Sequence, residues 1–279
     1  MAHPNLLPEL VPTPDANTVP VVEFSHVSIG FDGKQVLQDI SFTAQQGETR
    51  ILLGPAGCGK SVLLKLANGL MRPDSGQVYV FGEEMSTLPQ NGLFRLREKV
   101  GMVFQESALF DSLTVRENVA YQLRAAHIED ATVEARVQEV LRFVELEHTL
   151  DKFPSQLSGG MRRRVAIARA IITHPELLLY DSPTGGLDPI TSATIIELIV
   201  KQRDVYGGTS LLITHRLQDA YMLATHIFNR ATNQIQRSPN NEINQKTTFL
   251  VLNNTHVVFD GTLQELQCAE DPFLKEFLS

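Results

Sequence analysis

The segment from residue 54 to residue 61 combines glycines with a lysine and a serine at a spacing that suits phosphate binding. It reads Gly54, Pro55, Ala56, Gly57, Cys58, Gly59, Lys60 and Ser61, which matches the pattern G-x-x-x-x-G-K-[ST] at every fixed position. Glycines let backbone N–H groups curl around phosphates, and a helix N-terminus favours negative charge. The lysine adds a point charge, and the serine hydroxyl is a ligand for Mg²⁺. The segment therefore predicts a nucleotide-phosphate site that extends to Val62.

Simpler interpretations exist for single residues of this segment. An ordinary glycine turn with an exposed lysine would contain the same residue types, but it would require neither the complete pattern nor a position between a strand and a helix. Cys58 is interpreted as a small residue that the loop tolerates, without a redox role. Lys60 is expected to be exposed in the empty loop, so its replacement should weaken binding more than stability.

The second half of a nucleotide site requires an acidic residue at the end of a buried strand. The apolar run 177–180 ends in Asp181, which is predicted to reach the Mg²⁺ shell, usually through water. A single Asp after an apolar run is more often a turn former. Its combination with the phosphate-binding segment favours the metal role.

The stretch from Leu157 to Arg164 places two glycines and three arginines at the start of a predicted helix. Ser158 has the residue type of a helix N-cap, and Gly159 and Gly160 leave backbone N–H groups open. The arginines lie in the first turn, where the helix dipole disfavours cations. A solvated charge run is the simpler explanation of this stretch in isolation. An anion held at the helix end would explain the arrangement better.

Hydrophobic patterning predicts the elements that must position these residues. Helices are predicted from the spacing of apolar residues, and strands from alternating or continuous apolar runs. The strands predicted at 177–180 and 209–214 are apolar at nearly every residue, as buried parallel strands are. The alternation predicts an α/β core with a mostly parallel sheet, interrupted by a helical block at about 114–152. The predicted strands are 21–29, 36–43, 49–53, 77–81, 100–104, 177–180, 209–214, one near Ile227 and 249–252, with a turn at Asp32 and Gly33 between the first two, and the predicted helices include 60–69 and 189–203.

Composition limits the class of protein. The chain has 279 residues, 43% hydrophobic and 20% charged, as is typical of globular domains. A net charge of -8 argues against a nucleic-acid binder, and two cysteines favour a reducing cytoplasm over a disulfide framework. No apolar run is long enough to cross a bilayer, and the start lacks the pattern of a secretory signal. Residues 1–20, with five of the 14 prolines, are expected to form an extended tail, and the Asn- and Gln-rich residues 229–246 a surface excursion.

Taken together, the motifs resemble those of the ATP-binding subunit of an ABC transporter. The resemblance runs from about residue 21 to the C-terminus. It implies a P-loop NTPase core, an N-terminal antiparallel β subdomain, an inserted α-helical subdomain at about 106–165, and an ATP hydrolase that uses ATP and Mg²⁺. Besides the phosphate-binding segment, the motifs are Leu-Ser-Gly-Gly at 157–160, Leu-Leu-Leu-Tyr-Asp at 177–181, Gly-Leu-Asp at 186–188 and Ile-Thr-His at 213–215.

Three single residues acquire roles from this resemblance. Phe31 stands where the family stacks an aromatic side chain on adenine. Gln105, at the end of a predicted strand, corresponds to a glutamine that senses Mg²⁺ and the partner permease. His215 resembles the switch histidine that contacts the γ-phosphate. A lone His is usually structural, but its position directly after a strand favours the switch role.

The resemblance also implies a second subunit. Ser158, Gly159 and Gly160 would contact the γ-phosphate bound to the opposite subunit. Two ATP molecules would then lie between two subunits arranged head to tail. Asp188 would lie in the loop that links the two sites.

Finer details resemble the ATPases of Mla-type, MCE-associated phospholipid transporters. These are residues 60–65 and 104–119, and Met161 followed by arginines. The implied cargo is a membrane lipid moved between the inner and outer membranes. The implied partners are transmembrane permease subunits, an identical ATP-binding subunit and an MCE-domain lipid-binding protein, without nucleic acid. The chain would be peripheral on the cytoplasmic side of the inner membrane.

The sequence departs from the family at Ser182. The family has a glutamate directly after the strand aspartate, where it polarises the attacking water, and serine is too short and too weakly basic to do so. His215 and Gln105 are then the other candidates for catalysis. A binding switch that dimerises with ATP but hydrolyses little is an alternative to a transport motor. A non-transport ABC protein acting on DNA or ribosomes is disfavoured, because the chain has one phosphate loop, no heptad run and a negative net charge.

Overall fold

A computed structural model of the chain describes residues 19–239 and 243–278. Most of the extended tail predicted for residues 1–20 therefore lies outside the described residues. The described strands are β1 (Val22–Phe31), β2 (Lys34–Ala44), β3 (Thr49–Leu53), β4 (Ser75–Val80), β5 (Glu83–Glu84), β6 (Val100–Val103), β7 (Leu177–Asp181), β8 (Thr209–Ile213), β9 (His226–Asn229), β10 (Gln234–Arg237), β11 (Thr247–Asn253) and β12 (His256–Thr262). The described helices are α1 (Lys60–Ala67), α2 (Gln90–Glu98), α3 (Val115–Ala125), α4 (Asp130–Phe143), α5 (Gly159–Ile171), α6 (Pro189–Tyr206), α7 (Leu217–Thr225), α8 (Leu263–Gln267) and α9 (Pro272–Leu278), with 3₁₀ turns at Glu147–Thr149 and Pro154–Gln156.

The central sheet has the strand order β12-β11-β3-β8-β7-β6, and all neighbours are parallel except β12 and β11. Successive side chains point to opposite faces of a strand. In β7, Leu178 and Tyr180 join the hydrophobic cluster on one face, whereas Leu177 and Leu179 join the cluster on the other. Both faces are therefore covered, which explains why nearly every residue of β7 and β8 is apolar. The prediction of a mostly parallel α/β sheet is confirmed.

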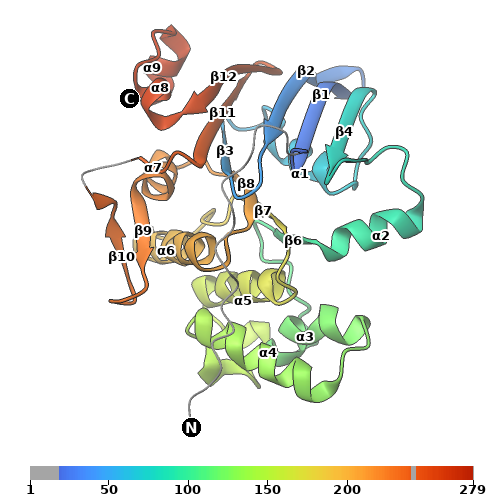
Figure 1. Cartoon of the computed structure of the whole chain (residues 1–279), viewed down its shortest axis with the longest axis vertical. Helices are drawn as coiled ribbons and strands as arrows, with labels where there is room; N and C mark the ends of the chain where they lie inside the picture. The colour runs from blue at the N-terminus through green and yellow to red at the C-terminus, as the bar shows by residue number, and fades with distance from the viewer. Residues whose placement is uncertain (1–18, 240–242, 279) are drawn as a thin grey trace.

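A smaller antiparallel sheet, β2-β1-β4-β5, packs with α1 over one face of the central sheet. Its first two strands are joined by a turn at Asp32 and Gly33, as the sequence predicted. Figure 1 shows β1, β2 and β4 at the opposite end of the molecule from α3 and α4. The N-terminal antiparallel β part of the predicted fold is thus present, and it brings the end of β1 toward the start of α1.

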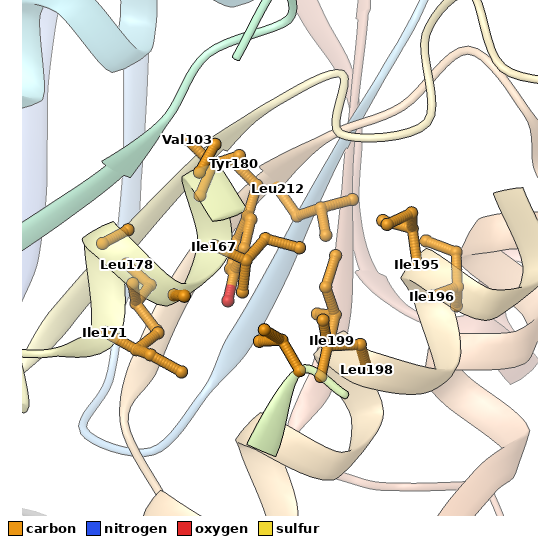
Figure 2. Close-up of a cluster of buried hydrophobic side chains, with 14 of the residues drawn as sticks. Val103, Ile167, Ile171, Leu178, Tyr180, Ile195, Ile196, Leu198, Ile199 and Leu212 are labelled. Atoms are coloured by element: carbon orange, nitrogen blue, oxygen red, sulfur yellow. The ribbon is translucent and has the colours of Figure 1, made fainter. Parts of the chain in front are cut away.

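The opposite face of the central sheet is covered by α5 and α6. Figure 2 shows Ile167 of α5 and Ile199 of α6 against Tyr180 and Leu212 of the strands. Helices α3 and α4 pack on the outer side of α5 in the same cluster. Helix α5 runs without a break from Gly159 to Ile171, so the predicted boundary of the helical subdomain near residue 165 falls inside one continuous helix.

The excursion predicted at residues 229–246 contains a strand that hydrophobic patterning missed. Strand β10 pairs antiparallel with β9, and both are partly exposed. Two arginines anchor this region: Arg203 of α6 donates to the carbonyl oxygens of Leu223 and His226, and Arg230 donates to those of Asp204 and Val205. The hairpin is therefore fastened to α6 by polar bonds, which leave little apolar pattern in the sequence. Helices α2, α7, α8 and α9 and strands β5 and β12 were not predicted either.

Within the described ranges, no helix is both long and apolar enough to cross a membrane.

Replacing a core residue of α6 should destabilise the fold far more than replacing an exposed one. We expect Ile196→Ala to lower the free energy of unfolding by about 2–5 kcal/mol, because Ile196 is fully buried in the cluster of Figure 2. Ile190→Ala is the matched control, since Ile190 lies on the same helix and is 82% exposed. It should change the free energy of unfolding by less than about 0.5 kcal/mol. Urea denaturation measures both values, and equal losses would contradict this assignment of the core.

Candidate nucleotide-binding site

The phosphate-binding segment connects the end of β3 to the start of α1. Its glycines have backbone angles that other residues rarely adopt, with φ of 141° at Gly54 and 95° at Gly59. A Cβ atom at Gly54 would lie 2.3 Å from the carbonyl oxygen of Leu252, and one at Gly59 would lie 2.6 Å from Cδ2 of Leu37. Gly59 also caps α1 without a side chain, so the first N–H groups of the helix stay open to an anion. The glycine pattern therefore has both a conformational and a chemical reason.

Lys60 is buried, with 4% of its surface exposed, and not exposed as the sequence analysis expected. Its Nζ atom donates to the carbonyl oxygens of Gly54 (2.9 Å) and Pro55 (2.7 Å) and lies 3.5 Å from Sγ of Cys58. The ammonium group of Lys60 is thus held by carbonyl oxygens at the start of the phosphate-binding loop. The expectation was wrong because the loop curls back over the lysine and presents its carbonyl oxygens to the ammonium group.

A hollow of about 320 Å³ opens beside this loop. It brings together residues from three separate parts of the chain: the hairpin of β1 and β2, the phosphate-binding loop with the start of α1, and the segment after β8. Phe31 is 41% exposed at its edge, as a stacking platform for a planar ring would be. The lining residues are Phe31, Val36, Ala56, Gly57, Gly59, Lys60, Ser61, Val62 and His215.

The candidate metal ligands meet where β7 ends. Ser61 Oγ donates to Asp181 Oδ1 over 3.0 Å, so the hydroxyl and the carboxylate share one location. No cluster of three His, Cys, Asp or Glu side chains within residues 19–239 and 243–278 could hold a metal ion alone. This donor set fits Mg²⁺, which prefers oxygen ligands and is usually bound through one or two carboxylates together with substrate phosphates and water. Gln105 follows β6, and its side chain lies against Gly185.

Ser182 directly follows β7 in a strained conformation. It is a buried residue with φ of 47°, in the left-handed region that residues with side chains seldom adopt. Its N–H donates to the carbonyl oxygen of Ile213 over 3.1 Å, which continues the pairing of β7 with β8. Where the resemblance places a catalytic glutamate, this chain therefore has a short hydroxyl on a constrained backbone.

His215 lies close to two opposite charges. Burial and the nearby Lys60 ammonium lower the pKa of His215 below its usual 6.5, and Asp181 acts against them. The imidazole is therefore neutral at pH 7. A neutral imidazole can donate a hydrogen bond through one nitrogen and accept one through the other, which suits contact with a phosphate or with water.

Four further site residues proposed from the sequence lie together outside this hollow, at the start of α5 and α6. Ser158 caps α5, with its Oγ accepting from the N–H of Met161, as predicted from its residue type. A Cβ atom at Gly160 would lie 2.4 Å from Cγ2 of Thr191, so the start of α5 packs closely against the start of α6. Asp188 caps α6, and hydrogen bonds from Thr191 lower the pKa of its carboxyl group. Ser158, Gly159, Gly160 and Asp188 thus gather at a second place, where α5 and α6 begin.

The three consecutive arginines near the start of α5 bind backbone carbonyl oxygens. Arg162 donates to Leu157, Arg164 to Val144, and Arg163 to Phe104, Gln105 and Gly185. Arg163 is buried, and this burial lowers the pKa of its guanidinium. Arg163 is therefore not a solvated charge, whereas Arg162 is exposed, and an anion at the start of α5 stays a prediction. Arg163 ties α5 to the loops that carry Gln105 and Gly185, a role for which the sequence offered no signal beyond the charge itself.

The structure also reveals a polar cluster that sequence reasoning missed. The Asp219 carboxylate accepts hydrogen bonds from Thr184 and Thr214 and pairs with Arg216. Burial raises the pKa of Asp219, and these three partners oppose the rise. Thr184 and Asp219 are 35 residues apart, and they meet because the ends of β7 and β8 are neighbours.

Comparisons with known proteins agree with this geometry. The family described as "ABC transporter" matches residues 37–185, more than half of the chain. The methionine import ATP-binding protein MetN of Bifidobacterium longum is 38% identical over 75% of this chain, and that of Legionella pneumophila (strain Lens) is 40% identical over 71%. The chain spans 54% and 58% of the lengths of these two relatives.

Two solved structures resemble the whole fold. CbiO1 of Clostridium perfringens, part of the ABC transporter complex cbiONQ, has a TM-score of 0.75 at 26% identity and covers 93% of this chain and 95% of its own. A dimeric structure of the ATP-binding cassette MJ0796, in a post-hydrolysis state bound to ADP and Pi, has a TM-score of 0.72 at 28% identity and covers 87% and 98%. With the family match and the curated relatives, these findings establish that the chain belongs to the ABC transporter family.

Proposed function

We propose that the chain is the ATP-hydrolysing subunit of a membrane transporter and that it works as a pair of identical copies. The observation that carries this proposal is the single hollow lined by Phe31, Lys60 and His215, beside which Ser61 lies 3.0 Å from Asp181. Phe31, the phosphate-binding loop, and Ser61 with Asp181 thus follow one another in the same order as the base, the phosphates and the Mg²⁺ of a bound nucleoside triphosphate. Family membership supports the same function.

The residues of the hollow divide the work of binding ATP. The open N–H groups of α1 receive the phosphates, and Phe31 receives the base. Lys60 moves its hydrogen bonds from the carbonyl oxygens of Gly54 and Pro55 to phosphate oxygens. Ser61, Asp181 and Gln105 would hold Mg²⁺, which would supply positive charge next to the phosphates.

Hydrolysis is expected to be slow because Ser182 supplies no carboxylate base. His215 is neutral and lies in the hollow, so it can orient a water molecule without supplying the base that a glutamate would be. The MJ0796 structure, in a post-hydrolysis state, favours a hydrolysing motor for this fold. An ATP-dependent binding switch with little hydrolysis is the alternative that Ser182 supports.

The cargo is a separate proposal. The sequence details that resemble Mla-type ATPases favour a phospholipid and an MCE-domain partner. The comparisons give this no support, since the relatives reported above are named for methionine import and the chain spans only about half of their length. An experiment can distinguish the two cargos. The permease is co-purified with this chain, and the complex is placed in lipid vesicles. ATP-dependent movement of a labelled phospholipid supports the first cargo, and ATP-dependent uptake of labelled methionine replaces it with the second.

The partners follow from the same proposal. A permease in the membrane receives this chain on its cytoplasmic face, where the chain is peripheral. In the second copy, Ser158, Gly159 and Gly160 approach the nucleotide bound by the first. The dimeric MJ0796 structure supports this pairing.

Lys60→Ala should weaken ATP binding by at least about tenfold. A hydrogen bond to a charged group contributes about 1.5–3 kcal/mol, and about 1.4 kcal/mol corresponds to a factor of ten. Calorimetric titration with ATP and Mg²⁺ measures the affinity. Lys65→Ala, on the same helix but outside the hollow, is the control and should bind ATP like the wild type. Unchanged affinity in Lys60→Ala would refute the phosphate-loop assignment.

ATP with Mg²⁺ should convert the chain from monomer to dimer, and Ser158→Arg should prevent this. The long side chain would occupy the place where the start of α5 meets the second copy. Sedimentation velocity with and without nucleotide measures the change. Ser155→Arg, at an exposed position three residues earlier, serves as the control. If Ser158→Arg dimerises as readily as wild type, the pairing is wrong.

Ser182→Glu should raise the rate of hydrolysis at least about tenfold, the lower part of what a positioned general base supplies. Binding of ATP should persist, since Lys60, Ser61 and Asp181 hold the phosphates and the metal. Phosphate release at saturating ATP is compared between wild type, Ser182→Glu and the exposed control Ser75→Glu. A wild-type turnover above about 1 per second that Ser182→Glu leaves unchanged would mean that another group already replaces the glutamate.

A further inference from the structure

Asp219 is a buried carboxylate that binds neither phosphate nor metal in the function proposed above. It lies on α7 with 4% of its surface exposed. Its Oδ2 atom accepts hydrogen bonds from Thr184 Oγ1 at 2.5 Å and from Thr214 Oγ1 at 3.0 Å. A buried charge is costly unless it is paired and hydrogen-bonded, so a carboxylate kept here needs these partners.

The two threonines belong to different segments of the candidate site. Thr184 lies in the loop that begins at Ser182, directly after β7. Thr214 follows β8 and precedes His215. One oxygen atom of Asp219 therefore fixes the spacing between the loop after Asp181 and the segment that carries the histidine.

Arg216 extends this connection to a third segment. Its Nε atom lies 3.4 Å from Asp219 Oδ1, and its Nη1 atom donates to Ser192 Oγ over 3.0 Å. Ser192 lies in the first turn of α6, and its N–H donates to the carbonyl oxygen of Asp188. The pair of Asp219 and Arg216 thus also reaches the place where α5 and α6 begin.

The loop after β7 requires such a connection. Ser182 has φ of 47°, and a residue with a side chain keeps that conformation only where its surroundings impose it. The hydrogen bond from Ser182 N to Ile213 O fixes the start of the loop, and that from Gly185 N to Ser182 O closes its turn. The bond from Thr184 to Asp219 holds the middle of the loop against α7.

We propose that Asp219 is a positioning residue for ATP hydrolysis, which holds the Ser182 loop and the His215 segment at one spacing through Thr184 and Thr214. The inference rests on the proposed hydrolysis of ATP. Because Asp219 does not line the hollow, its loss should lower kcat and leave the affinity for ATP unchanged. A misplacement of about 1 Å in a reacting geometry costs roughly a hundredfold in rate.

The kinetic experiment compares variants of the full chain with ATP and Mg²⁺. We expect Asp219→Ala to lower kcat roughly a hundredfold, with KM and the dissociation constant of ATP unchanged. Thr184→Val, which removes the hydroxyl group at constant shape, should also lower kcat, and Thr184→Ser, which retains it, should restore the wild-type value. Asp204→Ala is the matched control, because Asp204 pairs with Arg203 and accepts from the N–H of Phe228 far from the hollow.

Three kinetic outcomes would overturn the proposal. One is a kcat of Asp219→Ala equal to that of Asp204→Ala. Another is a loss that appears in KM and ATP affinity instead of kcat. The third is failure of Thr184→Ser to differ from Thr184→Val, which would assign the effect to packing.

Hydrogen–deuterium exchange without nucleotide tests the connection independently of hydrolysis. In Asp219→Ala, exchange should increase both in residues 182–188 and in residues 214–219, and in Asp204→Ala in neither. An increase confined to one segment would overturn the proposed coupling. If wild type releases no phosphate, the proposed hydrolysis fails, and the exchange result still decides whether Asp219 joins the two segments.

Discussion

The candidate site depends on the parallel alignment of β3, β8 and β7, which lie side by side in the interior of the central sheet. These strands are neighbours in fixed register, with Leu52 opposite Ile213 and Ile213 opposite Asp181. Their carboxyl ends therefore release the phosphate-binding loop, the His215 segment and the Ser182 loop side by side. Because both faces of the sheet are buried, a slip of one residue would exchange the side chains of the two hydrophobic clusters. The core thus sets the spacing of the site.

Those parts of the fold and site that depend on short sequence patterns were predictable. Strands β7 and β8 each contain a run of apolar residues, and the loop at residues 54–61 matches a pattern whose fixed glycines are each required by the backbone. Strand β10 and its pairing with β9 could not be predicted, because the attachment of this hairpin through Arg203 and Arg230 leaves no periodic apolar signal. The burial of Lys60 was missed for a related reason, since it depends on how the loop curls and not on the residues beside it.

Contacts between distant residues that belong to no recognised motif were beyond sequence reasoning. Thr184 meets Asp219 only after the register of β7 and β8 has been set, and nothing in the residues near either predicts the other. The cargo lies outside sequence reasoning for a different physical reason. The hollow is proposed to hold a nucleotide, and none of its lining residues has a chemistry that depends on what a partner protein carries. The same site would serve the movement of a phospholipid or of methionine equally well.

The bonds of Arg163 have a mechanical consequence. A guanidinium group is a rigid planar fork, and here it grips carbonyl oxygens of Phe104, Gln105 and Gly185 from a helix that extends into the helical block. A rotation of α5 about its own axis would therefore either move the loops that carry Gln105 and Gly185 or break several charge-assisted hydrogen bonds. Helix α5 is thus rigidly connected to the backbone of Gln105 through Arg163. A displacement of α3 and α4, which pack on α5, would therefore be transmitted to Gln105.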